Sequence, residues 1–190
     1  MGPRAIDNSF AAEAAGETPS VANGLAGESF ASLLLPHFDA AYSFARFLSR
    51  DAAAAEDIVQ EAFLRALRGF ANYRGGDAKS WLLAIVRNCV SNWARGRRAA
   101  PETALEDPQL LVDEEQDTPE RTVTRQSEID GIRQLIESLP EPFREALVLR
   151  ELEELSYRQI AQVTGVPVGT VMSRLARARG MLTQQLERQP

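Results

Sequence analysis

The sequence predicts an all-helical (all-α) protein of two small domains joined by a flexible acidic linker. Apolar residues recur with the period of an α-helix over 34–98 and again over 129–186, and no stretch alternates with the period of a strand. Between these stretches, Pro101, Pro108 and Pro119 lie among acidic residues, a composition typical of an extended tether. We therefore expect a disordered tail over 1–28, a domain over 29–98, the linker over 99–127 and a second domain over 128–190.

The first domain is expected to contain three helices. Pro36 marks a kink or restart near the beginning of the first, and Asp51 is suited to cap the second. A loop over 72–77 separates the second helix from a third over about 79–98. The residues expected to face the core are Leu34, Phe38, Ala41, Ala45 and Leu48, then Val59, Ala62, Phe63, Ala66 and Phe70, then Leu82, Ile85, Val86, Cys89 and Trp93.

The second domain is expected to be a series of shorter helices. Pro140 ends the first of them, and Pro142 fits the first turn of the next. Ser156 and Gln159 form a capping box that opens a short helix through Val163, and a last helix runs over about 168–186. The expected core residues are Ile129, Ile132, Ile136, Leu139, Phe143, Ala146, Leu147, Val171, Leu175 and Leu182.

Composition favours a soluble protein of the cytoplasm. Apolar residues make up 44% of the chain and charged residues 25%, and no apolar run near the N-terminus resembles a signal peptide or a membrane span. Cys89 is the single cysteine, so no internal disulfide can form, which fits a reducing compartment. Its place on an apolar face predicts a small core residue.

Charge is distributed unevenly along the chain, whose formal net charge is −6. Residues 30–98 hold six acidic and ten basic residues, residues 99–127 hold eight acidic and two basic ones, and residues 156–180 hold four arginines and no acid. Because local charge decides where phosphate can bind, the sequence predicts two basic surfaces separated by an acidic segment.

The stretch from Ser156 to Leu175 has the pattern of a helix-turn-helix. Ala161 is small where two helices cross, Gly165 suits the turn, and Val166 and Val171 fit the corner. The second helix of such a motif enters the major groove of DNA. The residues expected on its outward face are Thr170, Ser173, Arg174 and Arg177. A charged, solvated surface is the alternative for any one of these arginines, but the complete pattern favours DNA binding.

Two blocks of sequence together resemble the sigma-70 family of bacterial RNA polymerase sigma factors. Asp57–Phe63 (DIVQEAF), Tyr73–Gly76 (YRGG) and Lys79–Asn88 (KSWLLAIVRN) resemble its region 2. Leu139–Ala146 (LPEPFREA), Ser156–Ala161 (SYRQIA) and Gly169–Arg179 (GTVMSRLARAR) resemble its region 4. The absence of a block between them is similar to the extracytoplasmic-function (ECF) group. The resemblance implies a factor that binds core RNA polymerase and directs promoter-specific transcription initiation.

The resemblance also implies roles for named residues. Core polymerase would be bound through the clamp helices of its largest subunit and through its flap, and the predicted clamp-helix contacts are Asp57, Gln60, Glu61 and Phe63. The −10 element would be melted and held by Asn72, Tyr73, Lys79, Ser80, Trp81, Arg87, Asn88, Asn92 and Arg95, a basic and aromatic set suited to unstacked bases. The −35 element would be read by Arg158, Thr170, Ser173, Arg174 and Arg177.

Some of these roles have structural alternatives. Asp57 and Glu61 can simply favour the helix N-terminus, Phe63 lies on the apolar stripe, and Trp81 suits core packing as well as base contact. Arg158 either contacts phosphate or is merely exposed. The acidic linker either imitates nucleic acid in the polymerase channel or is a solvated tether.

Three other functional classes are disfavoured. His37, the only histidine, has no neighbours for a metal site or catalytic dyad, so no catalytic residue, metal or cofactor is expected and the chain is not expected to be an enzyme. A dimeric helix-turn-helix regulator would not need the block over 57–98. A mimic that only sequesters an anti-sigma protein would not need its promoter-reading residues. The expected partners are core polymerase, promoter DNA and an anti-sigma factor, without a small-molecule substrate or membrane insertion.

Overall fold

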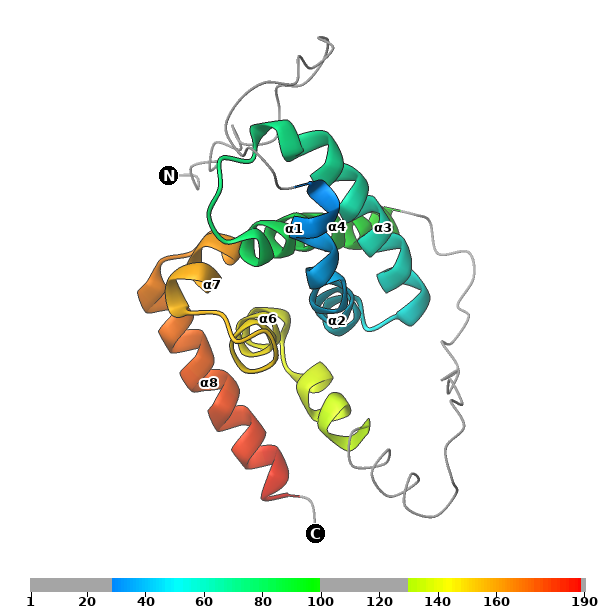
Figure 1. The fold of residues 1–190 in the computed structure, drawn as a ribbon. Coiled ribbons are helices and arrows are strands. Elements are labelled where there is room, and N and C mark those ends of the chain that lie inside the picture. Colours follow the sequence, from blue (N-terminus) through cyan, green and yellow to red (C-terminus); the bar gives the residue numbers. More distant parts are fainter. Residues whose placement is uncertain (1–28, 100–129, 189–190) are drawn as a thin grey trace, which may run out of the picture.

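The computed structural model describes residues 29–99 and 130–188. Within these ranges every regular element is a helix and no strand occurs, so the predicted all-helical class is confirmed (Figure 1). The predictions for the tail over 1–28, for nearly all of the acidic linker and for the core residue Ile129 concern residues outside those described. None of the helices in 29–99 and 130–188 combines the length and apolar character that a membrane crossing requires.

The N-terminal half contains four α-helices and two single 3-10 turns. They are α1 (Phe30–Leu34), η1 (Leu35–His37), α2 (Phe38–Ser49), α3 (Ala52–Gly69), η2 (Phe70–Asn72) and α4 (Ala78–Ala99). The break predicted at Pro36 is η1, where the proline occupies the first turn. Asp51 caps α3 as predicted, because its carboxylate accepts a hydrogen bond from the backbone N–H of Ala54 at 3.0 Å.

Helices α2, α3 and α4 pack around a core rich in alanine. Ala41, Ala45, Ala55 and Ala62 are fully buried, and small side chains at these positions allow the helices to approach closely. Cys89 is buried, as predicted. The prediction that Phe38 faces the core is wrong: its side chain is 47% exposed at the first position of α2, where it contacts the ring of Phe63.

The C-terminal half comprises a helix over 130–138, α6 (Glu141–Leu147), the π-helical turn η3 (Val148–Leu152), α7 (Tyr157–Thr164) and α8 (Val168–Leu186). Pro142 lies in the first turn of α6, and Ser156 and Gln159 form both hydrogen bonds of the capping box on α7, as predicted. Ile132 was expected in the core, but it is 59% exposed because it lies on the outer side of the first helix.

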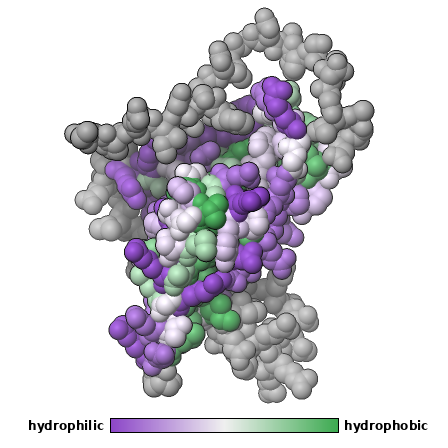
Figure 2. Space-filling view, turned by 90° about the vertical axis from the view of Figure 1, so that its left-hand side faces the viewer, coloured by the Kyte–Doolittle hydropathy of each residue, from purple (hydrophilic) through white to green (hydrophobic). Residues whose placement is uncertain are grey.

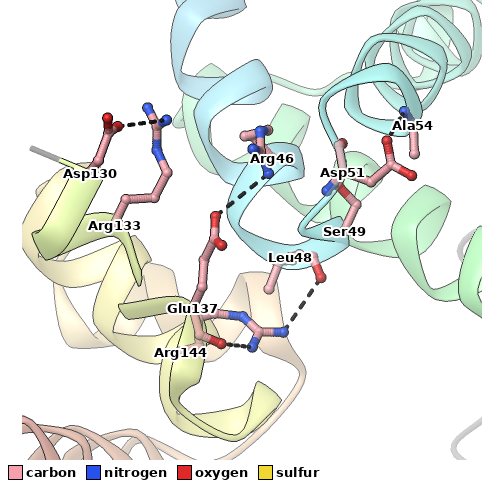
Figure 3. Close-up of polar contacts among 9 residues, drawn as sticks. All are labelled: Arg46, Leu48, Ser49, Asp51, Ala54, Asp130, Arg133, Glu137 and Arg144. Carbon is pink, nitrogen blue, oxygen red and sulfur yellow. Dashed lines mark hydrogen bonds and ion pairs between the residues drawn. The ribbon is translucent and has the colours of Figure 1, made fainter. Parts of the chain in front are cut away.

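The two halves pack against each other and share one continuous cluster of buried apolar residues. Helix α7 lies beside the first turns of α4, and α6 lies beside α2 (Figure 1). At the second of these contacts, the guanidinium of Arg144 donates to the carbonyl oxygen of Leu48 at 3.5 Å and to that of Leu139 at 2.8 Å. Figure 3 shows Arg144 beside the ion pair between Arg46 and Glu137, whose atoms are 3.5 Å apart.

Candidate nucleic-acid interface

The loop before α4 presents a small aromatic surface. Tyr73 stacks on Phe70, with ring centroids 6.1 Å apart, and lies 4.9 Å from the ring of Trp81. The Tyr73 hydroxyl donates to the carbonyl oxygen of Gly76 at 2.8 Å, which fixes the ring over the loop. Tyr73 and Trp81 are both half-buried, so each has one part in the core and one part accessible to a ligand, while Asn72 is exposed.

The first turn of α4 is held by Asp77. Its carboxylate accepts hydrogen bonds from the backbone N–H and the hydroxyl of Ser80 and, at 2.6 Å, from the side-chain amide of Gln159 in the other half. Partial burial raises the pKa of Asp77, but these hydrogen bonds outweigh burial and hold the pKa below its ordinary value. Ser80, predicted to contact DNA, is buried and bonded to Asp77, so the structure gives it a capping contact.

Further along α4, three predicted −10 residues form an exposed polar row. Asn88, Asn92 and Arg95 follow one another at intervals of four and three residues and therefore lie on one side of the helix. The Arg95 guanidinium donates to the side-chain oxygen of Asn92. Trp93, predicted in the core, is half-buried beneath the guanidinium of Arg97, 5.1 Å from its ring centroid.

Helices α7 and α8 and the turn between them form a compact two-helix unit. Gly165 ends α7 in the left-handed conformation, with φ of 68°, and its N–H donates to the carbonyl of Ala161 at 2.9 Å. Val171 is fully buried behind the turn. Arg158, Ser173 and Arg177 are exposed and Thr170 is half-buried, so the accessible side of α8 carries polar and cationic groups. Figure 2 shows that the face on this side of the molecule is largely hydrophilic, with small apolar patches.

Arg174 departs from the expected outward orientation. Its guanidinium lies 3.7 Å from the carboxylate of Glu145 in α6, and its side chain is 23% exposed. The same carboxylate receives the guanidinium of Arg87 from α4. Burial raises the pKa of Glu145, whereas the two arginines act in the opposite direction. One buried carboxylate therefore holds a predicted −10 residue and a predicted −35 residue.

Lys79 is likewise directed toward the other half. Its ammonium lies 2.8 Å from the carboxylate of Glu153 and donates to the Glu153 backbone carbonyl at 2.9 Å. Ligands can therefore reach the aromatic loop of Tyr73 and Trp81, the polar row from Asn88 to Arg95, and the outer side of α8. Three of the predicted cations, Lys79, Arg87 and Arg174, are instead paired with carboxylates.

The predicted polymerase-binding residues lie along α3. Asp57 and Gln60 are exposed, and Glu61 forms an ion pair of 2.6 Å with Arg65 one turn further on. Phe63 is half-buried, 6.4 Å from the ring of Phe30 and 5.7 Å from that of Phe38. The first three form a polar ridge, while Phe63 belongs largely to an aromatic cluster.

Comparison with known proteins places both halves in one family. The family model for sigma-70 region 2 matches residues 33–100, and that for sigma-70 region 4 matches residues 129–182. The chain belongs to the ECF group of sigma-70 family sigma factors. It therefore acts in transcription initiation, and we now refer to its halves as region 2 and region 4.

Individual relatives are consistent with this assignment. The RNA polymerase sigma-H factor of Pseudomonas aeruginosa is 41% identical over 145 residues, which cover 72% of this chain and 75% of that protein. The ECF RNA polymerase sigma-E factor of Escherichia coli is 37% identical, over 69% of this chain and 73% of that protein.

Solved structures show the same arrangement of helices. The sigma factor RpoE from Bartonella quintana, crystallised with the anti-sigma factor NepR, is 25% identical with a TM-score of 0.65, over 85% of this chain and 98% of that one. CnrH, in complex with the cytosolic domain of CnrY, has the same fold at 22% identity, with a TM-score of 0.61 over 85% of this chain and 89% of that one.

Sequence reasoning did not identify the carboxylates between the two regions. Glu137, Glu145 and Glu153 lie on segments that also carry exposed acids such as Glu141 and Glu151, so no local signal distinguished a buried acid from an exposed one. Such an acid implies a cationic partner, but the partner lies tens of residues away in the sequence and only the fold identifies it.

Proposed function

We propose that this sigma factor binds core RNA polymerase, recognises a −35 and a −10 promoter element, and opens the −10 region. The observation that carries the proposal is the presence of two separate polar faces on two domains. In region 4, Ser173 and Arg177 are exposed on α8. In region 2, Asn88, Asn92 and Arg95 form a row on α4 that begins two helical turns after Trp81, on the same side of the helix.

Each face suits a different form of DNA. Helix α8 is the second helix of a helix-turn-helix unit, whose accessible side fits the major groove of an intact duplex. A basic and amide-bearing row that follows Trp81 along α4 suits a single strand, because unstacked bases bind to aromatic rings and the backbone binds to cations. We infer that region 4 reads the −35 element and that region 2 holds the opened −10 strand.

Opening by this chain is expected to depend strongly on the −10 sequence. The only tryptophans, Trp81 and Trp93, are far apart in the chain, so no adjacent pair is available to wedge the duplex. Permanganate footprinting on matched and mismatched −10 elements tests this point. Equal opening of both elements would contradict it.

The polar ridge of Asp57, Gln60 and Glu61 on α3 is the proposed contact with the clamp helices of the polymerase. We also propose that an anti-sigma factor regulates the chain, since one structure of similar fold contains a sigma factor bound to such a protein. We propose that the chain acts in the cytoplasm, where polymerase and promoter are found.

Run-off transcription with purified core polymerase and a genomic promoter library tests the proposed function. We expect transcripts that begin at a defined set of promoters sharing −35 and −10 sequences, and none from polymerase alone. A palindromic footprint formed without polymerase would instead support a dimeric regulator.

A further inference from the structure

Helix α8 carries an exposed row of apolar residues beside its buried face. The residues that α8 buries are Val171, Leu175 and Ala178. Val168, Met172 and Ala176 follow one another at intervals of one helical turn, and all three are exposed. Met172 is 53% exposed and Val168 is 37% exposed. We call Val168, Met172 and Ala176 the apolar stripe of α8.

The apolar stripe contributes little to the fold of region 4. The hydrophobic cluster of the described residues includes Val166, Met181 and Leu182 at its margin, but neither Val168 nor Met172. A single exposed apolar side chain is normal on a protein surface, whereas a contiguous row of them marks a contact surface. The stripe is therefore available to a ligand at no cost to the core.

The surroundings of the apolar stripe are polar and cationic. Ser173 and Arg177 each follow a member of the stripe by one residue and are exposed on the adjoining side of α8. Arg158 is exposed on α7, the first helix of the same two-helix unit. No acidic residue occurs over 156–180. A ligand that fits this surface must therefore combine anionic groups with small apolar groups.

The major groove of DNA offers this combination. Phosphates follow both of its edges, and thymine presents a C5-methyl group on its floor, where alanine and other apolar side chains contact it. The flexible thioether of a methionine adapts readily to such a group. In a helix-turn-helix, the N-terminal residues of the second helix contact base edges. Val168 is the first residue of α8, and Met172 lies in its second turn.

We propose that the apolar stripe of α8 reads thymine methyl groups in the −35 element and that Met172 is its central, specificity-determining contact. The inference rests on the proposed function, because it requires α8 to enter the major groove of that element. The −35 residues predicted from the sequence are all polar or charged. The stripe adds a contact of a different kind, which selects thymine by its methyl group.

The length of the apolar stripe limits what it can read. Eight residues separate Val168 from Ala176, which corresponds to about 12 Å along a helix that rises 1.5 Å per residue. Successive base pairs are about 3.4 Å apart, so the stripe spans roughly three to four of them. We therefore expect thymine, on either strand, at one or more positions within a run of about four base pairs of the −35 element.

Replacement of thymine by uracil tests the inference, because it removes only the methyl group and leaves the base pair intact. The probes are duplexes of a promoter selected in the run-off experiment, with uracil placed at one −35 thymine at a time. Their binding to the full chain assembled with core polymerase is measured by competition. Uracil at a contacted thymine should weaken binding of the wild type about fourfold, which corresponds to about 0.8 kcal/mol.

Two variants assign the methyl contact to the stripe. Met172→Ala should leave the fold intact, because Met172 is exposed and alanine is favoured in a helix. At one contacted thymine at least, this variant should bind the thymine and uracil duplexes equally. Leu186→Ala is the matched control, since Leu186 is 56% exposed on the same helix but is its last residue. The control should keep the fourfold preference of the wild type.

Several results would overturn the inference while the proposed function stands. Selected −35 elements without thymine on either strand would do so, as would wild-type binding that tolerates uracil at every −35 thymine. An undiminished preference for thymine in Met172→Ala would also overturn it, and a loss of affinity for core polymerase in that variant would make the stripe a protein contact. Absence of promoter-specific transcription by the wild type would refute the proposed function and this inference together.

Discussion

Two glycines of region 4 are predicted to respond in opposite directions to the same substitution. Gly165 has φ of 68° at the end of α7, and Gly180 lies within α8 in ordinary helical conformation. A Cβ built on either glycine would meet no atom within 4 Å. Steric contact is therefore equal at both sites, and only the backbone conformation distinguishes the two alanine variants.

The magnitudes follow from the conformations. A residue other than glycine in the left-handed region costs about 1–2 kcal/mol, so Gly165→Ala should lower the free energy of unfolding by about 1 kcal/mol or more. Alanine in a helix interior is favoured over glycine by about 0.8–1.0 kcal/mol, so Gly180→Ala should raise the free energy of unfolding by a similar amount. Gly165→Asn should fall between the wild type and Gly165→Ala, because asparagine tolerates this conformation better.

Urea denaturation followed by far-ultraviolet circular dichroism measures these differences. The two alanine variants should move the midpoint in opposite directions without a change in slope, since neither alters the surface exposed on unfolding. A Gly165→Ala protein as stable as the wild type would refute the assignment of the left-handed turn. A destabilised Gly180→Ala protein would refute the account of α8 as a regular helix with open space at this position.

Further predictions concern DNA, polymerase and pH. Arg174→Ala should weaken discrimination among −35 sequences by about 1–3 kcal/mol in competition binding, whereas Arg179→Ala should not; an equal loss on all sequences would make Arg174 a phosphate contact. Asp57→Ala should reduce affinity for core polymerase by about 1 kcal/mol in a pull-down titration, and its exposed neighbour Glu56→Ala serves as the control. Because the pKa of Asp77 is lowered in the folded state, its ionised carboxylate stabilises the fold at pH values above the ordinary aspartate pKa of about 3.9. This contribution is lost as the pH falls through the lowered pKa. Asp77→Asn should therefore lessen the acid sensitivity of the unfolding midpoint below about pH 4, and an unchanged pH profile would contradict the role of this carboxylate.

Local signals in the sequence predicted the elements that the structure contains. Asp51, Ser156 and Gly165 mark helix ends because a cap depends on residues within one turn of itself. The helical period likewise identified most of the core, including Val171 and Leu175. These features need no knowledge of the rest of the chain.

Features that depend on distant partners could not be predicted in this way. The helical pattern gave no indication of the π-helical turn over 148–152, and Glu154 adopts a positive φ of 56° without glycine or asparagine to mark it. Chemical type and helical face indicate the candidate DNA residues. Their engagement by Glu145 and Glu153 follows only from the packing of region 4 on region 2.

Buried Arg144 joins the end of a region 2 helix to the end of a region 4 helix. Its guanidinium donates to the carbonyls of Glu137 and Leu139 at the end of one helix and to that of Leu48 at the end of another, so a single side chain serves two helix termini. A substitution of Arg144 would therefore remove a hydrogen-bond donor from both helix ends at once. One buried side chain thus couples the stability of the first helix of region 4 to that of α2.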